Sequence, residues 1–318
     1  MHKYFAVSKW LVRLFLTALF IVTLIVTGVS SASAHGFAGK RFFPTTLNID
    51  DPFVNDELSL LFNHIKESSP EGASARVSTL TADYGKTITK HLGISIGGAF
   101  INRNPQTGDT ATGFDNIDIG VKYQFLTNGV HETIISIGSG FSLANTGDAR
   151  VGAESVTVFS PTIFVGKGFG DLPDSMNALK PLAITGVFGG QIPSRRSTIT
   201  ATGIEHNPSF LSWGFTVQYS LHYLQSYVKD VGLPAPFDRM MPIVEFAFDS
   251  GLNRGDKRTT GTVNPGILWS GKSMQLGIEA QIPINSQSGN NVGVMMLLHF
   301  YIDDLFPGTF GKPLFNFR

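Results

Sequence analysis

Eleven polar or charged side chains fall on one face of alternating segments in this chain, and they are the residues that could do chemistry. If that face is enclosed, opposite charges could pair across a filled interior and hold it closed, since buried charges need partners. Alternatively, the same side chains could line a wet passage and set its preference for what enters. Both interpretations stay open from the sequence. The residues are Asp83, Asp118, Lys122, Gln124, Gln218, His222, Glu245, Asp249, Glu279, Gln281 and His299.

Hydrolytic chemistry would need a nucleophile, a base and an orienting group within mutual reach. His222 lies two positions from Ser220 on the same predicted face, and Glu245 and Asp249 fall on the next segment. Such proximity is expected by chance on a polar face. We therefore predict no catalytic residues, and a lipid hydrolase remains only a lesser alternative.

Cofactor and metal sites find little support. The chain contains no Walker loop, no H-E-x-x-H and no G-x-S-x-G sequence, and it has no cysteine for thiolate ligands. Gly36 to Lys40 is similar to a phosphate loop only superficially, because the full spacing is missing. His35 could hold copper with a free amino terminus, but no partner histidine follows at a suitable spacing. We predict neither a cofactor nor a metal.

The segment from Leu211 to Tyr223 shows which elements must position the polar residues. Its odd-numbered residues are large and apolar or aromatic, and its even-numbered residues are small or polar, as expected of a β-strand. Its length exceeds the usual soluble strand of about 5–6 residues and suits a tilted membrane-crossing strand of about 9–11. Trp213 and Tyr223 would then lie in the two interfacial aromatic girdles.

Similar segments recur along the chain and give a total of about twelve strands, the even number that bacterial barrels favour. Pro161, Pro242 and Pro265 each lack a ladder donor, which predicts bulges or strand ends placed differently. The predicted fold is all-β, a closed antiparallel transmembrane β-barrel. The other segments are Leu58–Lys66, Val77–Lys86, Leu92–Ile101, Asn116–Phe125, Ile135–Leu143, Ser155–Gly168, Leu182–Ile192, Met241–Asp249, Val263–Ser270, Met274–Ile282 and Val292–Ile302.

The N-terminus predicts export. Three basic residues precede an uncharged apolar run, and Ala32-Ser33-Ala34 supplies the small residues of a cleavage site. We predict a signal peptide over residues 1–34, a periplasmic or plug segment over 35–56, the barrel over 57–303 and a C-terminal tail over 304–318. An uncleaved anchor is the alternative for the first segment.

Composition agrees with this scheme. Charged residues make up 15% of the chain, against about 25% in typical soluble domains, and 35 residues are glycine. Removal of the basic N-terminus leaves a slightly acidic chain, which gives no support to nucleic-acid binding. The expected partners are outer-membrane lipid and a small-molecule solute, and the oligomeric state stays open.

The signal peptide and the alternating segments resemble those of outer-membrane barrels of Gram-negative bacteria. Leu80 to Ile101, with its strand, short turn and glycine-rich strand, is loosely similar to the MetA-type phenol-degradation transporter-like barrels. That resemblance implies passive movement of a small, aromatic or otherwise apolar solute and carries over no site residue. The expected function is an outer-membrane channel or facilitated-diffusion transporter. Alternatives are a structural or adhesive barrel acting through its outer loops and a soluble periplasmic β-protein.

Overall fold

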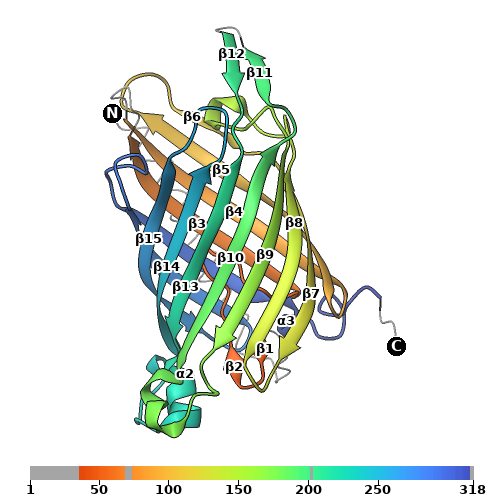
Figure 1. The fold of residues 1–318 in the computed structure, drawn as a ribbon, viewed down its shortest axis with the longest axis vertical. Coiled ribbons are helices and arrows are strands. Elements are labelled where there is room, and N and C mark those ends of the chain that lie inside the picture. Colours follow the sequence, from red (N-terminus) through yellow and green to blue (C-terminus); the bar gives the residue numbers. More distant parts are fainter. Residues whose placement is uncertain (1–35, 69–73, 201–202, 316–318) are drawn as a thin grey trace.

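Twelve antiparallel strands close into a barrel in the computed structural model, which describes residues 36–68, 74–200 and 203–315 (Figure 1). Closure is complete because β4 (Ser74–Thr89) pairs with β3 on one side and with β5 on the other. The short β6 (Ala111–Phe114) pairs with the same edge of β5 as β7 does, so it adds no position to the ring. The predicted closed barrel of about twelve strands is confirmed. The remaining strands of the ring are β3 (Glu57–Ser68), β5 (Leu92–Pro105), β7 (Asp118–Asn128), β8 (Thr133–Ser142), β9 (Val158–Gly168), β10 (Leu182–Pro193), β13 (Phe210–Tyr219), β14 (Met240–Gly251), β15 (Thr259–Ser270), β16 (Met274–Pro283) and β17 (Gly293–Tyr301).

The connections differ at the two ends of the barrel. At the short-turn end, β4–β5, β7–β8 and β15–β16 are joined by tight links, and the two longer links form short helices. At the long-loop end, the hairpin of β11 (Ser197–Thr200) and β12 (Gly203–His206) projects beyond the strands (Figure 1). Short turns face the periplasm and long loops the outside in barrels of this kind. The helical elements are η2 (Ala149–Val151), η3 (Asp174–Leu179), α2 (Leu221–Tyr223), the π-helical turn η4 (Leu224–Val228), η5 (Phe237–Arg239) and α3 (Ile302–Leu305).

An apolar belt covers the outside of the barrel. Because side chains alternate along each strand, one set points outward and the other into the lumen. The outward set includes many large apolar residues that are more than a third exposed, which suits contact with lipid. None of the described helices has both the length and the apolar character needed to cross a membrane. The belt includes Ile94, Ile96, Ile119, Val121, Tyr123, Ile137, Phe141, Ile163, Ile184, Phe188, Ile267 and Ile278.

Substitution Ile137→Arg tests the belt. Ile137 lies near the middle of β8 and its side chain is 47% exposed, so we expect the charge to cost about 2–4 kcal/mol of folding free energy in a bilayer. Urea-dependent folding into phospholipid vesicles measures the loss. The control is Ile199→Arg on β11, where the side chain is 87% exposed beyond the barrel. Equal losses from both substitutions would contradict the assignment of the belt to lipid.

The predicted strand from Leu211 to Tyr223 is too long by four residues. β13 ends at Tyr219, and Ser220 caps α2 by accepting a hydrogen bond from the Tyr223 amide at 3.1 Å. A serine side chain competes in this way with the strand ladder, and the alternating pattern continues through the cap without signalling it. Tyr223 is buried, so its predicted place in an aromatic girdle is wrong.

The three strand prolines do not sit at recorded register shifts. Those shifts lie between Thr87 and Thr89 and between Gln124 and Leu126. Pro242 lies near the start of β14, beyond the last pair that β14 forms with β13. Pro161 and Pro265 each lack a ladder partner on one side while the register continues unchanged, as a missing donor requires.

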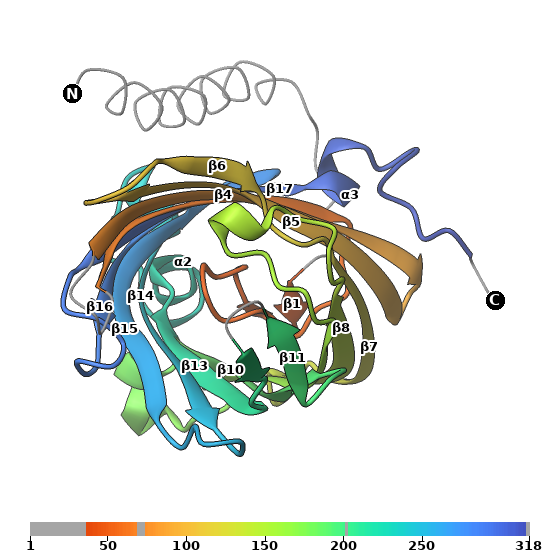
Figure 2. The same ribbon diagram turned by 90° about the horizontal axis from the view of Figure 1, so that it is seen from above.

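Residues 36–56, which we call the plug segment, fold into the barrel from the short-turn end (Figures 1 and 2). The segment begins with a small hairpin of β1 (Phe37–Ala38) and β2 (Arg41–Phe42). Its leucine Leu47 packs on lumen-facing residues of three strands, and Phe43 and Phe53 pack on Ile134 and Ala183. Two of the three buried apolar clusters therefore lie inside the barrel around this segment, and the third lies on the outward faces of β3, β16 and β17. The three strands around Leu47 contribute Met241, Ile243, Leu268, Met295 and Leu297.

The chain ends differ in how far the structure describes them. The predicted signal peptide over 1–34 lies outside the described residues. The C-terminal tail follows α3 and returns to the short-turn end, where the amides of Leu314 and Phe315 bond to the carbonyl oxygens of Thr87 and Ile88. Lys86 also donates to two carbonyl oxygens of this tail.

Candidate functional site: the lumen and its plug

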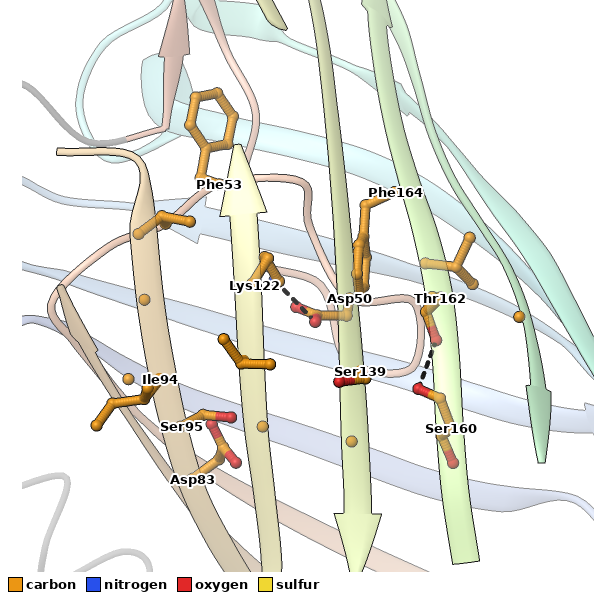
Figure 3. A pocket seen from close by; sticks show the side chains of 18 of the residues that line it. Asp50, Phe53, Asp83, Ile94, Ser95, Lys122, Ser139, Ser160, Thr162 and Phe164 are labelled. Atoms are coloured by element: carbon orange, nitrogen blue, oxygen red, sulfur yellow. Dashed lines mark hydrogen bonds and ion pairs between the residues drawn. The ribbon is translucent and has the colours of Figure 1, made fainter. Parts of the chain in front are cut away.

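A cavity of about 340 Å³ occupies the lumen above the plug segment (Figure 3). Its wall is made mainly of small glycine, serine and threonine residues from seven strands, which leave the space open. It reaches from Asp50 and Phe53 of the plug segment to Ser160 and Ser212, which lie close to the long-loop ends of β9 and β13. The volume is within the range of small-molecule sites, about 300–1,000 Å³.

Charge in the cavity is mostly negative. Lys122 forms an ion pair with Asp50 at 2.8 Å, donates to the Asp51 carbonyl oxygen at 2.8 Å and lies 4.5 Å from the Phe164 ring centre. Asp83 and Glu57 also line the cavity, and Lys122 is the only cation among the described residues that line it. The Asp83 carboxylate lies over Gly97, where an added Cβ would come within 2.5 Å of its oxygen.

Glu245 holds the tip of the plug segment. Its carboxylate accepts three backbone hydrogen bonds, from the amides of Leu47 at 2.8 Å, Asn48 at 2.7 Å and Ile49 at 2.9 Å. Glu245 is fully buried near the middle of β14. Hydrogen bonds to an ionised group are stronger than neutral ones, so this contact fixes the tip against the wall.

Other polar contacts fix the body of the plug segment. The Asp51 carboxylate accepts hydrogen bonds from the Phe53 amide at 2.8 Å and the Thr45 hydroxyl at 3.0 Å. Burial raises the pKa of Asp51 to about 6; Lys122 opposes that rise and Asp50 adds to it. Gln275 donates to the Thr45 carbonyl oxygen and Ser136 to that of Pro52. The backbone polar groups of the segment thus find partners on the wall, as buried groups require.

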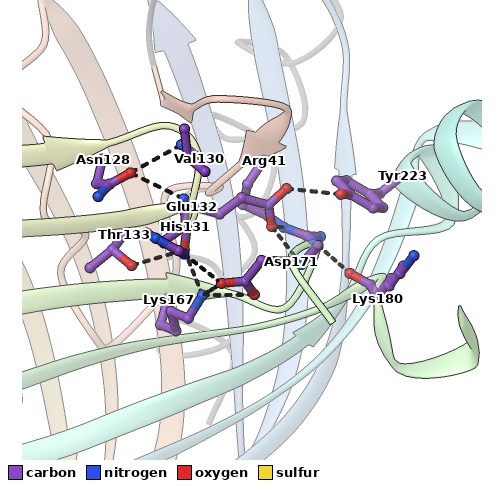
Figure 4. A network of polar contacts seen from close by, with 11 residues as sticks. Arg41, Asn128, Val130, His131, Glu132, Thr133, Lys167, Asp171, Lys180 and Tyr223 are labelled. Atoms are coloured by element: carbon purple, nitrogen blue, oxygen red, sulfur yellow. Dashed lines mark hydrogen bonds and ion pairs between the residues drawn. The ribbon is translucent and has the colours of Figure 1, made fainter. Parts of the chain in front are cut away.

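A buried network around Arg41 anchors the plug segment at the short-turn end (Figure 4). Arg41 forms an ion pair with Glu132 at 3.0 Å and donates to the carbonyl oxygens of Pro181 and Lys180. Its guanidinium stacks 3.8 Å from the Tyr223 ring centre, and the Tyr223 hydroxyl donates to Glu132 at 2.8 Å. Burial lowers the pKa of Arg41 while Glu132 opposes that shift, and burial, followed by Glu132, raises the pKa of Tyr223 to about 12. The alternating pattern of the barrel strands gives no signal for this network, because Arg41 lies in the plug segment, Glu132 and Lys180 in turns, and Tyr223 in α2.

Four of the predicted lumen residues contact the plug segment, and one more lines the cavity. His299 is one of the four: it is buried, its Nε2 lies 3.4 Å from the Thr45 hydroxyl, and its Nδ1 lies 2.9 Å from the Ser59 hydroxyl. Lys122 and Glu245 make the contacts described above, and Gln124 accepts a hydrogen bond from the Val54 amide at 3.2 Å. Asp83 lines the cavity without a contact to the plug segment that the structure records. These five residues bring the predicted lumen face and the plug segment together.

The remaining predicted residues are dispersed. Asp118 is exposed. It is separated from Asp83 by strand β5, where Gly97 pairs with both residues. Asp249 accepts hydrogen bonds from Ser212 and Gln191, and Gln281 accepts one from Asn63.

Of the last three predicted residues, two are buried in strands and one lies outside the lumen. Gln218 and Glu279 are buried, and their side-chain polar atoms have no hydrogen-bond partner among the described residues. His222 is on α2, exposed at the short-turn end, so its prediction as a lumen-lining residue is wrong. The strand pattern continues across the Ser220 cap and misplaces it.

The structure does not assemble the hydrolytic set considered from the sequence. Ser220 caps α2, His222 is exposed on that helix, and both oxygens of Glu245 accept backbone hydrogen bonds. Gly36 to Lys40 form the β1–β2 hairpin. Within the described ranges, no group of three or more histidine, aspartate or glutamate side chains gathers in a way that could hold a metal ion. His35 lies outside the described residues.

Comparison with known proteins identifies no family. No family model and no curated protein sequence matches the chain. Among solved structures, the NanC porin has a TM-score of 0.47 at 11% identity, covering 76% of this chain and 98% of that chain. The KdgM porin gives 0.44 at 9% with the same coverage. The translocator domain of autotransporter NalP from Neisseria meningitidis gives 0.42 at 9%, covering 77% of this chain and 86% of that chain.

Such low similarity carries no function to this chain, and the resemblance to the MetA-type barrels stays a prediction. The chain's own architecture is nevertheless specific. A closed barrel satisfies every ladder within itself, and its outward side chains form an apolar belt. This chain therefore has the architecture of a membrane-spanning β-barrel.

Proposed function

We propose that this protein is an outer-membrane channel or facilitated-diffusion transporter for a small solute, with no enzymatic activity, and that the plug segment closes its lumen. The observation that supports it is the cavity, which extends from near the long-loop ends of β9 and β13 down to Asn48, Asp50 and Phe53 of the plug segment. A filled structural barrel would not need a space of about 340 Å³ lined by small side chains. Passage requires the plug segment to move.

The lining suggests the kind of solute. Phe53, Val54, Phe164 and Val187 offer apolar contact, while serine and threonine hydroxyls and carboxylates offer hydrogen-bond acceptors. We expect a small solute with an apolar or aromatic part, as the resemblance to the MetA-type barrels also implies. A net positive or neutral solute would suit the acidic wall better than an anion.

Conductance of the refolded chain 35–318 in planar bilayers tests the proposal. We expect discrete openings that a panel of small aromatic and aliphatic amines and alcohols blocks from the long-loop side. Absence of any conductance, both in the unaltered protein and in a variant with the plug contacts removed, would contradict a channel.

Selectivity should follow the cavity charge. Substitution Asp83→Asn together with Asp118→Asn removes one carboxylate that lines the cavity and a second one near it on β7. We expect the preference for K⁺ over Cl⁻ to fall by about threefold or more, since rings of carboxylates select cations. The reversal potential in a KCl gradient measures it. Asp174→Asn is the control, because Asp174 is at the short-turn end with its side chain 93% exposed. An unchanged reversal potential in the double variant would contradict the role of this wall.

A structural or adhesive barrel is the second candidate. The β11–β12 hairpin projects at the long-loop end, and its cross-strand pair Ile199 and Ile204 is 87% and 69% exposed. Exposed apolar pairs of this kind are typical of contact surfaces. Deletion of residues 197–206 separates the candidates, because adhesion would be lost while a channel would still conduct.

A further inference from the structure

A group of buried polar side chains lies on the lumen wall beneath the tip of the plug segment. Glu245, Asn264 and Glu279 come from three adjacent strands, β14, β15 and β16, and are at most 1% exposed. Asn264 lies directly across from Glu245 in the β14–β15 register. Thr216, also fully buried, lies across from Glu245 on β13.

Glycine packing brings the two carboxylates of this group together. Glu279 pairs with Gly266, and an added Cβ at Gly266 would come within 2.4 Å of the Glu279 Cγ. The Glu279 side chain therefore lies over Gly266, toward β14, and interacts electrostatically with Glu245. Any larger residue at position 266 would push it away.

The polar atoms of this group are largely unsatisfied. Both oxygens of Glu279, both amide atoms of Asn264 and the Thr216 hydroxyl have no hydrogen-bond partner within the described part of the chain. Two ionised carboxylates offer each other only acceptors, so neither can satisfy the other. Buried polar atoms without partners are rare in proteins and point to a bound water or ion.

Among the described residues, no positive side chain pairs with either carboxylate. The described ion pairs include none to Glu245 or Glu279, and Lys122 is paired with Asp50 on another part of the wall. The plug residues above the group, Thr46 to Ile49, carry no charge. Glu279 pairs across the sheet with Met295, which is apolar. Two carboxyl groups at this depth need either a shared proton or a positive partner, since a buried charge is neutralised, paired or bound to a metal ion.

We propose that Glu245, Asn264 and Glu279 form a binding site for a single Ca²⁺ ion. Calcium takes six to eight oxygen ligands from carboxylates, amide carbonyls and waters in flexible geometry, which matches this set of donors. The Glu279 oxygens and the Asn264 side-chain oxygen are the main ligands, and Thr216 can add a hydroxyl oxygen. Glu245 can contribute only its Oε1, which accepts one backbone hydrogen bond while Oε2 accepts two. The site has two carboxylates, and amide and hydroxyl oxygens supply the rest.

The position of the site beneath the plug segment determines when the ion can enter. The site is covered by the plug segment, whose amides bond to the other side of Glu245. The ion is therefore taken up as the segment docks, and it exchanges slowly afterwards. It also stabilises the docked segment, because it removes the repulsion between Glu279 and the carboxylate that holds the tip.

Retention of calcium by the refolded protein tests the site. Chain 35–318 is refolded with CaCl₂ or with EDTA, free ions are removed on a desalting column, and calcium is measured by atomic emission. We expect about one Ca²⁺ per chain after refolding with CaCl₂. Glu279→Gln, which keeps the side-chain shape, should lower retention about tenfold or more. Asp118→Asn, a matched change on another part of the wall, should leave it unchanged.

A second variant and a melting experiment distinguish loss of the calcium site from misfolding of one variant. Asn264→Ala removes an uncharged ligand and should also lower retention, so the result does not depend on one variant folding. The calcium-refolded protein should melt at a higher temperature than the EDTA-refolded protein, and Glu279→Gln should remove that difference. The calcium site would be overturned if the unaltered protein retained no calcium, or if Glu279→Gln retained as much as the unaltered protein. It would also be overturned if the protein melted at the same temperature after refolding with CaCl₂ and with EDTA, which would instead favour a proton shared between the two carboxyl groups. These readings do not depend on channel activity.

Discussion

Glu245→Leu should release the tip of the plug segment and raise the open fraction of the channel. Three amides would lose their common acceptor, and each buried donor left without a partner costs about 1–3 kcal/mol. Even at the low end, about 3 kcal/mol shifts the ratio of docked to undocked states by about a hundredfold. Single-channel recording in bilayers measures the open fraction.

Two control variants should give smaller changes in the open fraction than Glu245→Leu. Glu245→Gln keeps one acceptor oxygen and should give an intermediate open fraction. Asp249→Asn changes a carboxylate on the same strand that contacts Ser212 and Gln191 but not the plug segment, so it should leave the open fraction unchanged. Identical recordings from Glu245→Leu and the unaltered protein would show that the tip contact does not hold the lumen closed.

Arg41→Met should loosen the other end of the plug segment. The substitution leaves Glu132 buried without its ion pair, and breaking a buried pair in this way costs about 3–5 kcal/mol. We expect faster amide hydrogen exchange over residues 36–44, since the β1–β2 hairpin loses its link to the Pro181 and Lys180 carbonyl oxygens. Mass spectrometry of peptides from the segment measures the rate.

Adding a second substitution tests whether the lost ion pair is the cause. Arg41→Met combined with Glu132→Leu removes both charges, and replacing a buried pair by apolar residues is often close to neutral. The double variant should recover most of the protection lost in Arg41→Met. Exchange that stays fast in the double variant would assign the anchor to the carbonyl contacts and the Tyr223 stacking instead.

The barrel itself could be predicted because its cause is local. Side chains along each strand point alternately to lipid and to the lumen. Apolar residues at every second position, such as Ile94 and Ile96, therefore predict a strand with one lipid-facing side. The pattern fails where a local contact overrides it. Ser220 turns the chain into α2 while the alternation of residue types continues to Tyr223, so the sequence places His222 in the lumen wrongly.

The plug segment could not be predicted in the same way. Residues 36–56 have no regular period, and their partners, such as Glu245, lie about two hundred residues away in the sequence. One signal was present: β17 carries apolar residues on both faces, and its lumen-facing Met295 and Leu297 pack against Leu47. A strand of a water-filled barrel would not place such residues inward, so they mark where the lumen is filled.

Side-specific labelling of introduced cysteines tests most directly whether the cavity is open at one end and closed at the other. The chain has no cysteine, so Ser160→Cys supplies one thiol in the cavity wall and Ile137→Cys one on the lipid face. In vesicles, a charged, membrane-impermeant thiol reagent should modify position 160 from the long-loop side only, and from both sides once Glu245→Leu is added. Position 137 should resist it throughout. Modification of Cys at position 160 from both sides, or from neither side, in the protein with Glu245 intact would contradict a cavity that is open at the long-loop end and closed by the plug segment.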